Sequence, residues 1–252
     1  MPTPGEWNLR FARFVTATPE LIAGRGLQRR GDTKFVVPQA AAFDLLGVLQ
    51  DHYAVLRTAA GGVLAAYDTV YFDTAELALF HAHRRGYRVR HKVRVRHYAD
   101  RGISLLEIKT RRSEFVTEKV SCPHDYRDDT MSSRDRTFVH ARTGLRRELS
   151  PQARVTYRRL TLLGLDTHER VTLDLDLCFG PAAAHRAAEG LAIVEVKQPQ
   201  FSGHTPAMCA LRAGGWQPGW SSKYCAAIAA TRPAERRNRL LPGLRPLLGE
   251  AA

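Results

Sequence analysis

The sequence has little of what most metal and redox sites require. It holds only four cysteines, at positions 122, 178, 209 and 225, and no Cys-x-x-Cys pair. Neither a zinc site nor a redox dithiol is therefore indicated. Cysteines that are far apart in the sequence are expected to be reduced thiols, as in cytosolic proteins, so we expect a cytoplasmic protein.

Other recognisable patterns are also missing. No stretch approaches 18 apolar residues, which predicts no membrane span. Residues 1–7 lack the charged and apolar regions of a signal peptide. Walker A, Gly-x-Gly-x-x-Gly, Gly-x-Ser-x-Gly and His-Glu-x-x-His patterns do not occur. The sequence thus gives no support for a P-loop, a dinucleotide fold, a serine hydrolase or a zinc protease.

What the chain has in excess is positive charge. Its 252 residues carry 38 Lys and Arg against 25 Asp and Glu, a formal net charge of +13. Such a balance points to an anionic partner: nucleic acid, polyphosphate, a nucleotide or an anionic membrane surface. The hydrophobic fraction of 44% is ordinary and allows a packed core.

The charge is most regular in residues 88–96, where cations alternate with mostly valine. A strand sends successive side chains to opposite faces, so this pattern predicts one strand with a row of cations on one face. The row would be roughly 26 Å long, and like charges on one strand face repel unless an anion lies along them. A solvated, Arg-rich face is the alternative interpretation. The cations are Arg88, Arg90, Lys92, Arg94 and Arg96.

Eight segments with this alternation predict eight strands, and helical spacing predicts helices between them. Eight strands are about the number that closes a barrel. The pattern permits a tunnel with the charged faces inward and the apolar faces packed outward under helices. An antiparallel sheet with its polar faces in water is the usual alternative. A hairpin turn is expected at Asp100–Gly102. The expected strands are 27–37, 63–72, 88–96, 104–112, 115–121, 154–163, 170–177 and 191–196; the expected helices are 39–52, 75–85, 182–189 and an Ala-rich segment after Tyr224.

Acidic residues stand among the bases, and Glu195 is the best candidate for a metal ligand. It alternates with valine on the strand that also carries Lys197. Mg²⁺ and Mn²⁺ are commonly held by one or two carboxylates together with phosphate oxygens. A salt-bridged wall residue is the alternative for Glu195. Ion pairing explains Glu107, Asp174 and Asp32 equally well or better.

Single-stranded nucleic acid is disfavoured as a partner. Proteins that bind it interleave aromatic rings with cations, because bases stack on rings. The basic stretch has no aromatic residue between Arg88 and Arg96, and only Tyr87 and Tyr98 flank it.

Eight short motifs together resemble the VTC domain, the catalytic domain of the vacuolar transporter chaperone polyphosphate polymerase, in its bacterial stand-alone form. The resemblance covers about residues 27–232, preceded by an extension with one short helix (1–26) and followed by a basic tail (233–252). The motifs are RGDTKF (30–35), YFDT (71–74), KVRVR (92–96), LEIK (106–109), YRR (157–159), RVTLD (170–174), VEVK (194–197) and SKY (222–224).

The resemblance implies a member of the triphosphate tunnel, or CYTH-like, metalloenzymes. It therefore implies an α+β fold, an eight-stranded antiparallel β-barrel tunnel with charged faces inward and helices packed outside. It implies a transferase that passes the γ-phosphate of ATP to inorganic polyphosphate, with Mn²⁺ or Mg²⁺ as cofactor and Glu195 as metal ligand. Further phosphate-binding residues are expected at Lys92, Arg154 and Lys197. Carried over by motif, the catalytic bases are Lys34, Arg94, Arg96, Lys109, Lys119, Arg159, Arg170 and Lys223.

The chain also departs from the family. Many tunnel enzymes begin with Glu-x-Glu-x-Lys, but here only Asp32 precedes Lys34, and Phe35 replaces the usual Tyr. Strand parity alone would put Arg158, rather than Arg159, on the face of Arg154. Fewer acids suit a polymerase better than a triphosphatase, and they leave room for an inactive member. The alternatives are a triphosphate or nucleoside triphosphate hydrolase and a non-catalytic polyphosphate-binding module.

Overall fold

The structure is a computed structural model. It describes residues 3–25, 31–113, 116–180, 186–219, 222–232, 235–236 and 240–248. The expected strand segment 27–30, including Arg30 of the first motif, lies outside the described residues, as do Phe115 and residues 182–185. The chain divides into two compact units. Unit 1 comprises residues 1–65, 157–177 and 188–221, and unit 2 comprises residues 66–156, 178–187 and 222–252.

The eight expected strands are confirmed. They form one hydrogen-bonded path in the order β2-β11-β9-β8-β4-β5-β6-β7. The neighbours β2–β11, β11–β9, β4–β5, β5–β6 and β6–β7 pair antiparallel. In the described part of the chain no pairing joins β2 to β7, so this sheet is not closed into a barrel. The path strands are β2 (Gly31–Pro38), β4 (Leu64–Asp73), β5 (Arg90–Tyr98), β6 (Ile103–Arg111), β7 (Thr117–His124), β8 (Ser150–Gly164), β9 (Arg170–Phe179) and β11 (Leu191–Gln198).

Three short strands were not expected: β1 (Val15–Thr16), β3 (Tyr53–Val55) and β10 (Arg186–Ala187). β10 overlaps the predicted helix 182–189, so that prediction is wrong for the residues described. Arg186 and Ala187 instead pair with Phe179 and Cys178 of β9. Ladder hydrogen bonds with β9 therefore override the helix propensity of this Ala-rich segment.

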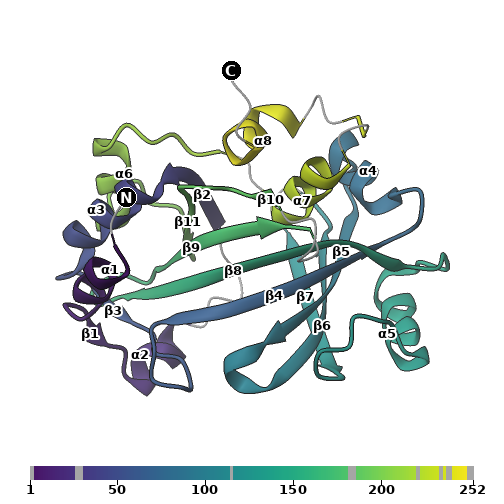
Figure 1. Ribbon diagram of the computed structural model, residues 1–252, viewed down its shortest axis with the longest axis horizontal. Helices are drawn as coiled ribbons and strands as arrows, with labels where there is room; N and C mark the ends of the chain where they lie inside the picture. The colour runs from purple at the N-terminus through teal and green to yellow at the C-terminus, as the bar shows by residue number, and fades with distance from the viewer. Residues whose placement is uncertain are drawn as a thin grey trace. The chain divides into compact units, whose positions relative to one another are not determined.

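In unit 1 the valine faces of the strands pack under helices, as expected. Val194 and Val196, which flank Glu195, are fully buried with Leu46 of α3 and Leu211 of α6. Figure 1 shows α3 (Gln39–Leu49) and α6 (Pro206–Ala213) beside β2 and β11. Ahead of them, residues 3–25 form two helices instead of one, α1 (Pro4–Phe11) and α2 (Pro19–Gly24). Since Val194 and Val196 point into this core, Glu195 must point to the opposite face.

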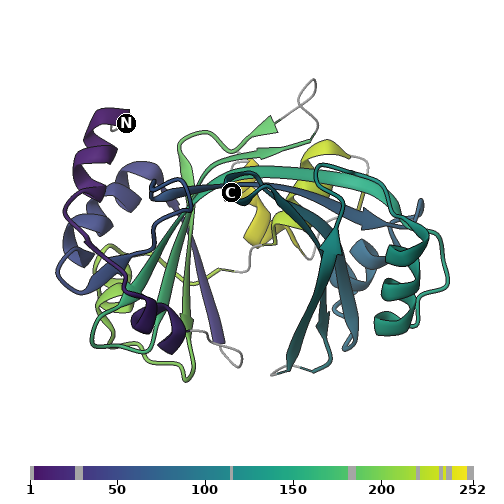
Figure 2. The ribbon, with the colours of Figure 1, turned by 90° about the horizontal axis from the view of Figure 1, so that it is seen from below.

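In unit 2 the same division holds for β5 and β6. Val93, Val95, Leu106 and Ile108 are buried in a cluster that includes Val139 of α5. Figure 2 shows α5 (Ser133–Thr143) alongside the strands of this unit. The predicted hairpin is confirmed: η1 (Ala99–Arg101) and Gly102, in the left-handed conformation at φ 61°, join β5 to β6.

The end of β4 is tied to two helices by a buried carboxylate. Asp73 accepts hydrogen bonds from the backbone N–H groups of Thr74 (2.7 Å), Leu79 (2.8 Å) and Phe80 (2.8 Å), the last two in α4 (Ala78–Arg85). The hydroxyl of Tyr224 in α7 (Lys223–Thr231) also donates to Asp73. The carboxylate thus satisfies amides at the start of α4, where a negative charge is favourable.

Part of the basic tail forms a helix with buried leucines. α8 (Leu241–Leu248) belongs to unit 2, and Leu244, Leu247 and Leu248 are buried. Arg186 donates a 2.6 Å hydrogen bond to the carbonyl of Leu248. None of the helices in the described ranges is long and apolar enough to cross a membrane. All four cysteines are free thiols.

Candidate functional site

The predicted site residues fall into two groups, one in each unit, and each group lies mainly on the strand faces opposite the buried valines. We call them cluster 1 and cluster 2. Cluster 1, in unit 1, contains Lys34, Arg159, Arg170, Glu195 and Lys197. Cluster 2, in unit 2, contains Lys92, Arg94, Arg96, Lys109, Lys119 and Lys223, and the remaining predicted residue, Arg154, also lies in unit 2.

Cluster 1 is set by the pairing of β11 between β2 and β9. Glu195 stands opposite Lys34 on one side and opposite Thr172 on the other. Two residues further on, Lys197 stands opposite Asp32 and Arg170. Directly opposite residues on a sheet share a face, so this register gathers two lysines, an arginine and a glutamate on one surface.

Glu195 is buried between two ammonium groups. Lys34 Nζ lies 3.5 Å from Glu195 Oε1, and Lys197 Nζ bonds Oε2. Burial alone would raise the pKa of Glu195, but the charges of Lys197, Lys34 and Arg159 outweigh it and hold the pKa well below its usual range. Glu195 is therefore ionised at neutral pH, and its oxygens are held by cations on flexible stems.

The two acids of β9 are each paired with an arginine of β8. Arg159 binds Asp174 through two hydrogen bonds of 2.5 and 2.8 Å, and the Asp174 carboxylate is almost fully buried. Arg158 pairs with the exposed Asp176. The structure therefore brings Arg159, the arginine indicated by the motif, close enough to Glu195 to lower its pKa.

Cluster 2 contains a row of three lysines running across three strands. Lys92 of β5 is directly opposite Lys109 of β6, which is directly opposite Lys119 of β7. Cβ atoms in such pairs are about 4.5–5.5 Å apart, and like charges placed there destabilise a sheet. Arg90 and Arg111 form a further like-charged pair beside this row. A sheet surface built this way is matched to a ligand with several negative charges.

Glu107 is the anionic centre of cluster 2. Its carboxylate accepts hydrogen bonds from Arg94 (2.7 Å), Lys119 (2.5 Å) and the hydroxyl of Tyr98 (3.1 Å), and Arg96 lies 4.0 Å away. Burial would raise the pKa of Glu107, but the charges of Arg94, Arg96 and Lys119 outweigh it and lower the pKa below its usual range. Glu107 therefore fixes where these cations point.

We predict that Glu107→Gln lowers the free energy of unfolding by about 2–3 kcal/mol at pH 7, because the buried Arg96 and the partly buried Arg94 lose their counter-charge. The folded-state pKa is depressed, so the carboxylate stabilises the protein above the unfolded-state pKa of about 4.3. Below about pH 4.3 this stabilisation decreases as the pH falls, and it is gone once the pH is below the folded-state pKa. Denaturant unfolding of wild type and variant from pH 7 to pH 3 should show the two converging.

The matched control is Glu118→Gln, which removes an exposed β7 carboxylate paired with Arg112. It should change stability by less than about 0.5 kcal/mol. A Glu107→Gln variant as stable as this control at pH 7 would show that the cations do not depend on Glu107.

The start of α7 is joined to the lysine row. Ser222 is the N-cap of α7, its hydroxyl accepts from the backbone N–H of Cys225, and it also receives a 2.7 Å hydrogen bond from Lys92 Nζ. Lys223 is the first residue of the helix. Helix N-termini favour anions through their unsatisfied N–H groups, so cluster 2 combines lysines with a second anion-attracting element.

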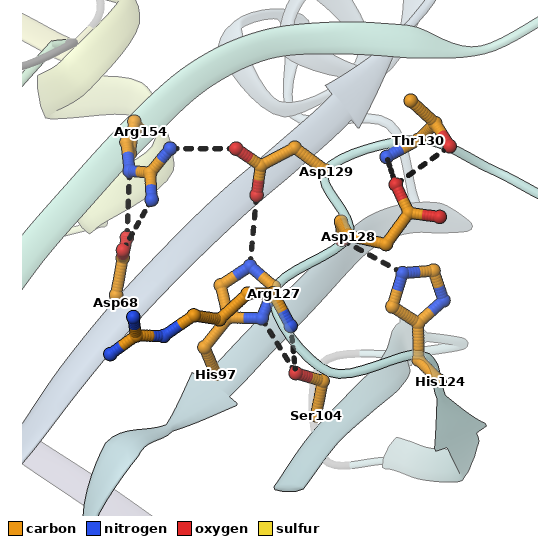
Figure 3. A network of polar contacts seen from close by, with 9 residues as sticks. All are labelled: Asp68, His97, Ser104, His124, Arg127, Asp128, Asp129, Thr130 and Arg154. Atoms are coloured by element: carbon orange, nitrogen blue, oxygen red, sulfur yellow. Dashed lines mark hydrogen bonds and ion pairs between the residues drawn. The ribbon is translucent and has the colours of Figure 1, made fainter. Parts of the chain in front are cut away.

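Arg154 is placed in a different network, shown in Figure 3. Its guanidinium binds Asp68 and, at 2.7 Å, Asp129. The other oxygen of Asp129 is 2.9 Å from His97 Nε2, and His97 Nδ1 is 2.6 Å from the Ser104 hydroxyl. These partners connect β4, β5, β6 and the segment before α5. The two ion-pair partners of Arg154, Asp68 and Asp129, are not cluster 2 residues.

Sequence reasoning missed two side chains that position cluster residues. Thr172 accepts a 3.2 Å hydrogen bond from Lys197, and Ser222 holds Lys92. Both stand inside motifs, RVTLD and SKY, but hydroxyl residues carry no charge pattern to mark them. Ser222 was detectable as a helix N-cap preceding an Ala-rich run.

No curated protein sequence matches the chain. Among solved structures, a candidate adenylate cyclase from Bacillus halodurans is similar with a TM-score of 0.47 and 10% identity, covering 77% of this chain and 94% of that chain. A candidate adenylyl cyclase from Hippeastrum, described as having a dominant triphosphatase activity, gives a TM-score of 0.47 and 15% identity over 79% and 95% of the two chains.

The sequence comparison with protein families is more specific. The profile of the VTC domain matches residues 29–232, which is most of the chain and includes every predicted site residue. The matched range holds both clusters, with the alternating cations of β5 and the Glu195 strand. The chain therefore belongs to the VTC domain family.

Proposed function

We propose that the protein is a metal-dependent polyphosphate polymerase that transfers the γ-phosphate of ATP to inorganic polyphosphate. The observation that carries this proposal is the row Lys92, Lys109 and Lys119, in which like charges stand directly opposite one another on three strands. Three ammonium groups on one sheet surface can bind successive phosphates through charge-assisted hydrogen bonds. Membership of the VTC domain family supports the same reading.

The chain's own residues would act by position and charge. Phosphoryl transfer requires the reacting oxygens to be aligned and the charge on the transferred group to be neutralised, with little covalent chemistry by the protein. Arg94 is fixed by Glu107, and Lys92 is fixed by Ser222. These cations are thus held in place before substrate arrives, which lowers the cost of organising them in the transition state.

The donor set fits a divalent cation that arrives with the nucleotide. No group of three or more His, Cys, Asp or Glu that could hold a metal exists in the described ranges. Mg²⁺ and Mn²⁺ are commonly bound by one or two carboxylates plus substrate phosphates. Arg159 binds Asp174 bidentately, whereas Glu195 is bound by lysines, whose flexible side chains can adopt other positions when a cation binds. Glu195 would hold the cation, which would neutralise charge on the phosphates.

The proposal is tested by incubating the purified protein with ATP and Mn²⁺, then Mg²⁺, and separating the products by length. A ladder of polyphosphate that lengthens with time is the expected result. Free phosphate without chain growth would replace the polymerase with a triphosphate hydrolase. Tight polyphosphate binding without turnover under either metal would make the protein a binding module.

We also predict that polyphosphate binding depends on the charge of Lys197. Burial lowers the pKa of Lys197 to about 8, although Glu195 partly opposes this. Below that value Lys197 is a cation that offsets Glu195; above it the ammonium is lost, and the unbalanced carboxylate repels phosphate. Affinity for tripolyphosphate should therefore fall several-fold between pH 7 and pH 9.5 in wild type, relative to Lys197→Arg, which stays charged.

The measurement is calorimetric titration of both proteins across this pH range. The effect of protonation of tripolyphosphate on affinity is the same for both proteins, so it cancels in the comparison. Parallel pH profiles for wild type and Lys197→Arg would show that Lys197 does not control the charge of cluster 1.

A further inference from the structure

Unit 2 contains a cavity of about 710 Å³ beside α5, and none of the residues of cluster 1 or cluster 2 lines it. Its size is within the usual range for sites that bind small organic molecules. Its lining combines an aliphatic part with a charged part. The aliphatic residues are Met131, Val139, Leu145 and Leu149, and the cationic residues include Arg136, Arg146 and Arg147.

One wall of this cavity is fixed by the network of Figure 3. Two residues before Met131, the Asp129 carboxylate is held by His97 and Arg154 at 2.9 and 2.7 Å. Asp128 then accepts two 2.8 Å hydrogen bonds from Thr130, one from its backbone N–H and one from its hydroxyl. The backbone that leads into Met131 is therefore anchored to the sheet.

The side of the cavity nearest α5 is fixed as well. The capping box of Ser132 and Asp135 starts α5 immediately after Met131. Arg136 donates a 2.6 Å hydrogen bond to the carbonyl of Met131, so its side chain bridges the helix and the preceding segment. Met131 thus lies between two fixed segments, and the residue is buried.

Residues 145–149, which also line the cavity, are tied to the end of α5. Gly144 ends the helix in the left-handed conformation at φ 72° and donates to the carbonyl of His140 at 2.8 Å. The N–H of Leu145 bonds the Thr143 hydroxyl at 3.1 Å, and His140 Nδ1 bonds the Leu145 carbonyl at 3.1 Å. Both walls are therefore formed before any ligand binds, which reduces the ordering cost of binding.

The lining determines the chemistry of a ligand. Three arginines and one glutamate, Glu148, line the cavity, so a negative charge is favoured. Met131 and Val139 are buried, whereas Leu145 and Leu149 are partly exposed. A purely polar anion such as polyphosphate would leave these two leucines exposed, and burying them against an apolar group is favourable. Among the described residues, no Phe, Tyr or Trp lines the cavity, and His140 is its one aromatic lining residue. A concave site suits one small molecule better than a flat membrane surface.

We propose that this cavity binds a small organic anion with an aliphatic body and one carboxylate or phosphate head. The aliphatic body lies on the partly exposed Leu145 and Leu149, next to the buried Met131 and Val139, and the head is held at Arg146 and Arg147. The site is separate from the proposed polyphosphate chemistry, so it can exist whether or not the protein is a polymerase.

The test uses octyl phosphate and octanoate as probes, with inorganic phosphate as the polar reference and the full chain as the protein. Methyl NMR should show saturable shifts for Met131, Val139, Leu145 and Leu149 with at least one amphiphile, and the stronger probe identifies the head group. Inorganic phosphate should leave these methyl signals unchanged. Absence of saturable binding by both amphiphiles would overturn the proposal, as would equally tight binding of inorganic phosphate at these methyls.

Charge is tested with the double variant Arg146→Gln, Arg147→Gln. It should weaken binding of the preferred amphiphile at least about tenfold, the loss expected for two charge-assisted contacts. The control is Arg142→Gln, which removes an exposed α5 arginine that stacks on Phe138 and does not line the cavity. Equal affinities for wild type and the double variant would overturn the assignment of the head group and with it the proposed ligand class.

Discussion

Replacing Glu195 with glutamine is expected to lower the rate of polyphosphate synthesis by about 100-fold or more while the protein stays folded. Glutamine keeps the size and one acceptor oxygen but loses the charge that would hold a divalent cation. The binding of tripolyphosphate, in contrast, should not be weakened. Lys34 and Lys197 lose their counter-charge, so the affinity for tripolyphosphate should be unchanged or higher.

This split between turnover and binding separates a catalytic carboxylate from a structural one. The measurements are the initial rate of chain growth, calorimetric affinity for tripolyphosphate and the unfolding midpoint. Asp176→Asn is the control, because Asp176 is an exposed β9 carboxylate paired with Arg158. Undiminished turnover in Glu195→Gln would remove Glu195 from the mechanism, and lost binding together with lost stability would make it a structural residue.

Replacing Asp73 with alanine is expected to lower the free energy of unfolding by about 3–5 kcal/mol, because buried donors left without a partner cost about 1–3 kcal/mol each. Three backbone N–H groups and the Tyr224 hydroxyl all donate to this fully buried carboxylate. Burial, with the charge of Asp73, raises the pKa of Tyr224 above its usual range, so Tyr224 remains a donor. The measurement is denaturant unfolding followed by circular dichroism.

Two comparison variants make the Asp73 prediction quantitative. Tyr224→Phe removes one donor only and should cost about 1 kcal/mol. Asp44→Ala changes an exposed carboxylate on α3 and should stay within about 0.5 kcal/mol of wild type. A loss for Asp73→Ala no larger than that for Tyr224→Phe would show that the backbone N–H groups at the start of α4 find other partners.

The strands were predictable because charge and apolarity alternate with a period of two. Glu195 between Val194 and Val196 is the clearest case, and the structure buries the two valines under α3 and α6. The short strands β1, β3 and β10 were not predictable in this way, because two or three residues are too few for alternation to show. β10 in particular lies in a segment with helical composition, and only its pairing with β9 makes it a strand.

The partners of the charged residues were harder to predict than the residues themselves. The row of Lys92, Lys109 and Lys119 depends on the register of three strands. The turn at Asp100–Gly102 fixes the pairing of Lys92 with Lys109, because the loop length of a hairpin sets the register of its two strands. The pairing of Asp174 with Arg159 could not be counted in this way, because the turn between β8 and β9 gives no comparable signal.

The ion pairs of Arg154 could not be predicted from the sequence. Its position in an alternating strand is compatible with phosphate binding, but it contacts Asp68 and Asp129. Asp129 lies in a polar segment without periodicity, so nothing in its sequence indicates which side chain it meets. Long-range ion pairs of this kind follow from the tertiary structure and not from a local pattern.

The most direct test of the central claim is the balance between ADP released and phosphate added to chains. The protein is incubated with ATP, Mn²⁺ and a short polyphosphate primer, and ADP, free phosphate and chain-bound phosphate are measured over time. The proposed polymerase predicts one phosphate added to a chain for each ADP released, with little free phosphate. One free phosphate for each ADP, with chains of unchanged length, would contradict it.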